Sequence, residues 1–205
     1  MKNFENIKNL LPLGYLYLVV LGVIKESIVF YQLGINIIKY SSVMDILLSP
    51  IAVITSHPLI IFTFLLFSVY PFFVARMFTK HSEKKWVRLT FGIKKNRLEM
   101  NEVEIEKYKN TLVIFMFVFI YLSLFLGMAF QQGYMTSQEI KNDQLKYKHE
   151  LYFVTGESQT VKIIDNNSEY FFYVAKGNKN INIIPKLSIK KIEMIENKML
   201  NNKRD

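Results

Sequence analysis

Residues 112–130 read LVIFMFVFIYLSLFLGMAF, and this stretch decides the class of the protein. Its nineteen residues carry no charged side chain. An α-helix rises ~1.5 Å per residue, so the stretch is long enough to cross the ~30 Å hydrocarbon core of a bilayer. A soluble helix usually keeps a polar face, whereas this one is apolar on every face. The stretch therefore predicts a membrane-spanning helix and an integral membrane protein.

Two further apolar segments precede this stretch. Residues 10–33 carry only two charged side chains, Lys25 and Glu26, and residues 59–75 carry none. Each segment is long enough to span a bilayer as a helix. The fold class expected is a membrane all-α module of about three transmembrane helices, followed by a small mainly-β domain.

The segment between these two spans is harder to interpret. Residues 34–45 mix polar and apolar side chains, as an interfacial connection does. Residues 46–54 are apolar but short, contain Pro50 and are followed by His57-Pro58. A short packed or re-entrant segment is expected here, with one crossing after it. A single proline-kinked helix over residues 46–75, or two crossings within that range, are the alternatives.

The positive charge of the chain indicates its orientation. The net charge is +9, and the loop 76–109 contributes ten basic against five acidic residues. Lys and Arg accumulate on the cytoplasmic side of membrane proteins. The N-terminus and the loop 76–109 are therefore expected in the cytoplasm of a cell whose inner membrane holds this multi-pass chain. Three crossings then place the C-terminal domain on the outer side, and a nucleic-acid polymer is not an expected partner.

The same loop predicts contact with lipid headgroups. Its first part is almost purely basic and also contains a tryptophan, a combination that suits an anionic membrane surface. The residues expected there are Lys84, Lys85, Trp86, Arg88, Lys94, Lys95 and Arg97.

Four polar residues are candidates for an intramembrane polar path: Lys25, Glu26, Asp45 and His57. Lys25 is expected to snorkel to the interface, because its long side chain can reach water. The alternative is a buried functional pair that faces other helices or a water-filled path. Neighbouring helical residues point about 100° apart, so Lys25 and Glu26 are not expected to pair with each other.

The composition changes after residue 131. The transmembrane module is assigned to residues 1–131, a polar linker or helical extension to 132–148, and a small β domain to 149–205. Short β-branched and aromatic runs are separated by turn residues and predict five strands. These are residues 150–154, 160–164, 170–175, 181–184 and 189–195. Their spacing is similar to that of SH3-like or other small barrels in general shape.

One strand of this domain is densely aromatic. Residues 170–173 read YFFY, and alternate side chains of a strand face opposite sides of a sheet. One alternating pair is expected in the core, and the other is available for a ligand or partner. The candidate binding residues are Tyr170, Phe172, Lys176 and Lys179.

No catalytic or metal-binding pattern is present in the sequence. The chain has no cysteine, and its three histidines, at positions 57, 81 and 149, lack metal-ligand spacing. Phosphate-binding and nucleophile motifs are also missing from the sequence. No enzyme activity, cofactor or metal is therefore expected.

These features favour a non-enzymatic membrane sensor, effector or accessory protein. In this hypothesis the β domain binds a partner protein or ligand, such as a small nucleotide, and signals to the helices, which self-associate into a homo-oligomer. The plan of a few helices with one compact sensor module is similar in architecture to accessory and effector proteins of bacterial defence systems, including CRISPR-associated ones. The alternative is a small channel or transporter subunit with Lys25 and Glu26 lining a polar path.

Overall fold

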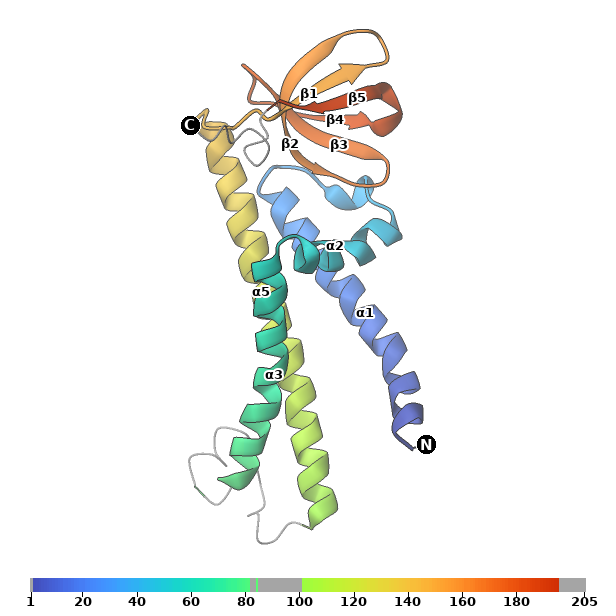
Figure 1. The fold of residues 1–205 in the computed structure, drawn as a ribbon, viewed down its shortest axis with the longest axis vertical. Coiled ribbons are helices and arrows are strands. Elements are labelled where there is room, and N and C mark those ends of the chain that lie inside the picture. Colours follow the sequence, from blue (N-terminus) through green and yellow to red (C-terminus); the bar gives the residue numbers. More distant parts are fainter. Residues whose placement is uncertain (1, 82–83, 85–100, 196–205) are drawn as a thin grey trace, which may run out of the picture. The chain divides into compact units, whose positions relative to one another are not determined.

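The structure, a computed structural model, describes residues 2–81, 84 and 101–195 (Figure 1). It contains the helices α1 (Lys2–Tyr31), α2 (Val43–Thr55), α3 (Pro58–Lys80) and α5 (Glu102–Lys141), and a short 3-10 helix, η1 (Ile37–Lys39). The chain forms two compact units. Residues 1–50 and 126–205 make the first, which we call the sheet unit, and residues 51–125 make the second, which we call the α3 unit.

The prediction of a membrane protein with three spans is supported. Three helices are long and apolar enough to cross a membrane: Pro12–Tyr31 of α1, Pro58–Met77 of α3 and Val103–Lys141 of α5. Only 22% of the most apolar window of α3, and 22% of that of α5, is buried within the protein. The remaining apolar side chains require lipid around them, because water would make their exposure unfavourable.

The helix α2 is separate and too short to span a bilayer. It ends at Thr55, and α3 begins at Pro58 after the break at His57. Pro58 occupies the first turn of α3, where its missing N–H leaves no hydrogen bond unmade. The expected short segment before one candidate span is therefore present.

In the α3 unit, α3 packs against the first part of α5 through apolar and aromatic side chains. Val74 and Ala75 of α3 form a buried cluster with Leu112 and Val113 of α5. Aromatic rings continue this contact, and the centroids of Phe64 and Phe125 are 5.6 Å apart. This packing resembles that expected inside a bilayer, where tight van der Waals contact replaces the hydrophobic effect.

In the sheet unit, glycines allow close helix contacts. A Cβ atom on Gly22 of α1 would overlap the carbonyl oxygen of Ile46 on α2. A Cβ atom on Gly133 of α5 would overlap the Gln32 side chain of α1 and lie 3.0 Å from the carbonyl oxygen of Val29. Both contacts depend on the absence of a side chain, as is common for helices in membranes.

The C-terminal part forms a five-stranded antiparallel sheet. Its strands are β1 (His149–Phe153), β2 (Ser158–Asn166), β3 (Tyr170–Ala175), β4 (Ile181–Pro185) and β5 (Ile189–Met194). All five predicted strands are present, and the linker is partly helical, since α5 continues to Lys141. The strand order is β4-β3-β2-β1-β5, so β4 and β5 are the edges. The sheet is not closed by a β4–β5 pairing, and an SH3-like or barrel fold is not confirmed.

The two faces of this sheet have different neighbours along β3. Tyr173 packs with Leu151, Phe153 and Val161 on one face, which we call the outer face. Phe172 packs on the opposite face, which we call the inner face, with Phe30 of α1. Figure 1 shows the sheet beyond the C-terminal end of α1. Alternate side chains of β3 therefore point to the outer face of the sheet and to the helices.

Candidate functional site

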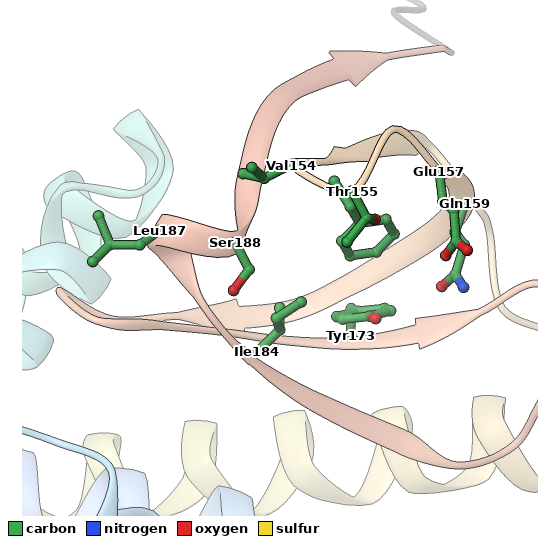
Figure 2. A pocket seen from close by; sticks show the side chains of 9 residues that line it. Val154, Thr155, Glu157, Gln159, Tyr173, Ile184, Leu187 and Ser188 are labelled. Atoms are coloured by element: carbon green, nitrogen blue, oxygen red, sulfur yellow. The ribbon is translucent and has the colours of Figure 1, made fainter.

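The outer face of the sheet opens into a cleft of about 540 Å³ (Figure 2). The β1–β2 turn and the β4–β5 connection form its two walls, and Tyr173 and Ile184 lie between them. Glu157 and Gln159 mark one end. The residues that line the cleft are Phe153, Val154, Thr155, Glu157, Gln159, Tyr173, Ile184, Leu187 and Ser188.

The rim of the cleft exposes large apolar side chains. Leu187 is 93% exposed and Val154 is 65% exposed, although both lie in a folded sheet domain outside the membrane-spanning segments. Glu157 is the only charged residue of the lining. Burial in the floor raises the pKa of Tyr173, so its hydroxyl is neutral at pH 7. The cleft thus offers an apolar surface with a few hydrogen-bonding groups and one negative charge.

The inner face of the sheet is attached to the helices by aromatic contacts. The ring centroids of Phe172 and Phe30 are 4.9 Å apart with an edge-to-face geometry. Tyr40, just after η1, makes similar contacts with Tyr170 at 5.6 Å and with Phe172 at 6.1 Å. Such pairs contribute about 0.5–1.5 kcal/mol beyond the area they bury. The inner face therefore meets a membrane-spanning helix directly.

Polar bonds fix the β2–β3 turn to the start of α2. Asp45 accepts hydrogen bonds from the backbone N–H and the hydroxyl of Ser168, at 2.9 and 2.8 Å. It also accepts two bonds from Ser42, whose hydroxyl in turn accepts the Asp45 N–H, as in a capping box. Burial would raise the pKa of Asp45, but these hydrogen bonds together lower it. The ionised carboxylate thus joins the turn to the helix.

A buried polar cluster joins α1 to α2. Lys25 and Glu26 of α1 are 6% and 9% exposed, and the Lys25 ammonium lies 2.7 Å from a Glu26 carboxylate oxygen. The same oxygen accepts a hydrogen bond from Ser49 of α2. The predicted snorkelling of Lys25 is therefore wrong, and so is the expectation that the two neighbours do not pair. Their long side chains bend toward each other, because a buried charge is stabilised by a paired opposite charge.

A second carboxylate, Asp165 of β2, faces this cluster. The β2–β3 register shifts between Ile163 and Asp165, which marks a bulge at Ile164. Cross-strand partners share a face, and Asp165 is opposite Phe172, so the bulge turns Asp165 to the inner face. Burial, and then the negative charge of Glu26, raise the pKa of Asp165 to about 6. The positive charge of Lys25 and the N–H of Asn166 oppose this rise but do not cancel it.

The structure does not bring the four predicted binding residues together. Phe172 is 1% exposed, and Tyr170 contacts Tyr40, so both rings are occupied within the chain. Lys176 is exposed in the β3–β4 turn, where Lys179 donates a hydrogen bond to the carbonyl of Lys141. The inner-face pair of β3, Tyr170 and Phe172, is therefore not open to a ligand, because α1 and Tyr40 cover it. Neither lysine lines the cleft.

The predicted intramembrane polar residues also lie in different parts of the structure. Asp45 begins α2, and His57 precedes α3 and accepts a hydrogen bond from the N–H of Leu59. Of the four predicted intramembrane polar residues, the structure pairs only Lys25 with Glu26. Lys84 is exposed. The other predicted headgroup contacts, Lys85, Trp86, Arg88, Lys94, Lys95 and Arg97, lie outside the described residues.

Sequence reasoning missed Asp165, Ser49 and the cleft. Asp165 lies beside a predicted turn, where acidic residues are common because they bond the turn backbone. The bulge that turns its side chain to the inner face has no clear pattern in the sequence. Leu187 was a signal for the cleft in the sequence. An isolated leucine in the connection between two predicted strands is not needed for the core of either strand. Within the described ranges, no group of three His, Asp or Glu residues could hold a metal ion.

Comparison with protein-family models, with curated proteins and with solved structures finds no match for this chain.

Proposed function

We propose that this chain is a non-enzymatic membrane sensor or effector in which the sheet binds a partner polypeptide and passes the event to the helices. One observation carries the proposal. Tyr173, in the floor of the cleft, and Phe172, which contacts α1, are neighbours on the same strand. A partner that displaces Tyr173 also moves Phe172, because β3 is held as a unit by its pairing with β2 and β4.

The lining favours an apolar side chain of a peptide as the occupant. Five of the nine lining residues are Phe, Val, Tyr, Ile or Leu, and the hydroxyl and amide groups at the rim can bond a peptide backbone. A nucleotide is a poorer fit, because its phosphates need basic side chains or a nest of N–H groups. The lining offers no Lys or Arg, and Glu157 would repel a phosphate.

A thermal-shift screen in detergent micelles tests this proposal. The probes are a set of N-acetylated tripeptide amides with Leu, Phe or Val at the centre, and a set of mononucleotides and cyclic dinucleotides. At least one apolar peptide is expected to raise the melting temperature, since a ligand of the folded state stabilises it by mass action. A shift by nucleotides alone would contradict the peptide assignment.

Matched variants show whether the cleft is responsible. Leu187→Asp places a charge on the rim and is expected to abolish the peptide shift. Ile192→Asp is the control, because Ile192 is 41% exposed on β5 but does not line the cleft. If the two variants lose binding equally, or if no peptide binds to the unmodified chain, the proposal fails.

The side of the membrane that the sheet occupies is part of the same proposal. Three candidate spans and the basic loop 76–109 support an outer location for the sheet and a cytoplasmic N-terminus. A pair of reporters fused after Asp205, one active only in the cytoplasm and one only outside it, distinguishes the two sides. Activity of the cytoplasmic reporter would reverse the orientation and restrict the partner to intracellular molecules.

A second candidate function is a channel or transporter subunit. The observation that favours it is the buried pair Lys25–Glu26 within the apolar segment of α1. Ion flux into liposomes that contain the purified chain would support it, provided that Glu26→Gln reduces the flux. The hydrogen bond from Ser49 to Glu26 favours a structural role for the ion pair over a role in transport, because it helps to satisfy the carboxylate within the protein.

A further inference from the structure

A carboxylate of the sheet lies at the interface with α1. Asp165 of β2 is opposite Phe172 on the inner face, and the Phe172 ring contacts Phe30, one helical turn after Glu26 on α1. The negative charge of Glu26 contributes to the raised pKa of Asp165. A bulge is needed to bring Asp165 there, since regular alternation would turn it toward the same face as Ile163 and Tyr173. Bulges re-aim side chains at functional positions.

The cluster contains one ammonium for these two carboxylates. Lys25 is bonded to Glu26 at 2.7 Å, and Ser49 donates to the same carboxylate oxygen. Asp165 accepts one hydrogen bond, at 2.8 Å, from the backbone N–H of Asn166, and no side-chain hydrogen bond among the described residues. A charged Asp165 is therefore poorly compensated in this partly buried place.

The other charged groups nearby do not supply the missing compensation. Lys162 lies opposite Val174 on the same face of β2, but it is not among the charges that shift the pKa of Asp165. Lys186, just before β5, donates its hydrogen bond to the side chain of Asn166. Asp45 of α2 is negative and is bonded to Ser42 and Ser168. Glu26 and Lys25 remain the charges that act on Asp165 from α1.

We propose that Asp165 is a proton-binding site that controls how firmly the sheet is held against α1. The protonated carboxyl gains an O–H donor and loses its repulsion from Glu26, so the sheet stays attached. The ionised carboxylate brings a second negative charge next to Glu26 and weakens the attachment. The inference goes beyond the proposed function, since it concerns the inner face and holds whatever the cleft binds.

The direction of the pH dependence follows from linkage. Burial and the charge of Glu26 raise the pKa of Asp165 from 3.8 to about 6. The folded state thus binds this proton more tightly than the unfolded chain does, by about 100-fold. The stability that the proton supplies is fully present only below the unfolded pKa of 3.8 and is lost as the pH rises through 6. Between pH 4.5 and 8, the equilibrium constant for folding of the sheet unit should fall about 30-fold from this group alone.

A urea titration in lipid–detergent micelles, followed by near-ultraviolet circular dichroism, measures this change. The unmodified chain is compared with Asp165→Asn at each pH, so that other titrating groups cancel. The folding constant relative to Asp165→Asn is expected to fall about 30-fold from pH 4.5 to pH 8. Glu169→Gln is the control, because Glu169 is an exposed acid of the same turn, and it should follow the unmodified chain.

A carbon-13 titration of the Asp165 carboxyl in the unmodified chain tests the proton site even if Asp165→Asn does not fold. A midpoint near pH 6 is expected, and it should move lower in Glu26→Gln, which removes the repelling charge. A midpoint near 4, or parallel pH curves for the unmodified chain and Asp165→Asn, would overturn the proposal.

Discussion

The two compact units of this protein are stabilised in different ways. The α3 unit is held by aliphatic and aromatic contacts between α3 and α5, with a hydrogen bond between Ser68 and Tyr121. The sheet unit contains Lys25 and Glu26, the only charged side chains classed as buried among the described residues. Apolar helix contacts can be surrounded by lipid, but a buried ion pair needs polar protein groups around it. The α3 unit is therefore held together by apolar packing, whereas the sheet unit also depends on buried polar contacts.

Removal of one member of the buried ion pair should have the largest effect. Lys25→Met leaves Glu26 as an uncompensated buried charge, and breaking such a pair costs about 3–5 kcal/mol. Denaturant unfolding of the purified chain in micelles measures the loss. The double variant Lys25→Met/Glu26→Gln should recover most of it, because no charge is then left alone. If the double variant is as unstable as Lys25→Met, the loss of stability does not come from an unpaired Glu26 charge.

The next largest loss of stability is expected from disturbing the close contact of α5 with α1. Gly133→Ala inserts a methyl group against Val29 and Gln32 of α1, and overpacking typically costs about 1–3 kcal/mol. The matched control is Gly127→Ala on the same helix, where no atom lies within 4 Å of the added carbon. This control should be neutral or slightly stabilising, since alanine favours helix over glycine by up to ~1 kcal/mol. Equal stability of the two variants would contradict the α1–α5 contact.

The link between Asp45 and the β2–β3 turn should contribute less. Asp45→Ala removes the bonds to Ser42 and Ser168, and loss of a helix cap alone costs about 1 kcal/mol. Because the pKa of Asp45 is lowered in the folded state, its contribution is present above pH 4 and is lost as the pH falls below its usual value of 3.8. Stability measured from pH 7 to pH 3 should fall less steeply in Asp45→Ala than in the unmodified chain.

The smallest effect is expected in the α3 unit. Ser68→Ala removes the hydrogen bond with Tyr121, and such bonds between membrane helices average about 0.6 kcal/mol. Its unfolding free energy in micelles should differ little from that of the unmodified chain. A loss comparable with that of Lys25→Met would remove the contrast between the two units.

The elements were largely predictable from the sequence, whereas the contacts between them were not. The run 112–130 and the aromatic strand 170–173 follow from hydrophobic length and periodicity, which act over neighbouring residues. The contact of Phe172 with Phe30 joins residues far apart in the chain, so periodicity shows that Phe172 is apolar but not what covers it. The Lys25–Glu26 pair does not follow from helix geometry, which points the two residues about 100° apart, because it depends on the reach of their long side chains.

Asp165 shows a further limit. Its face is set by a bulge that inserts one residue in β2, and strict alternation places it on the wrong side of the sheet. The homo-oligomer and the bacterial defence setting stay predictions, since no described contact bears on them.

Cross-linking across the inner face tests the central claim most directly. The chain has no native cysteine, so two introduced cysteines are the only thiols. With Phe30→Cys and Phe172→Cys, a short bifunctional thiol reagent added to membranes should join α1 to β3, seen as a proteolysis-resistant link by mass spectrometry. Phe30→Cys with Tyr173→Cys should not be joined, because Tyr173 faces the cleft. Equal cross-linking of both pairs, or of neither, would contradict the account that one strand faces the cleft on one side and a membrane helix on the other.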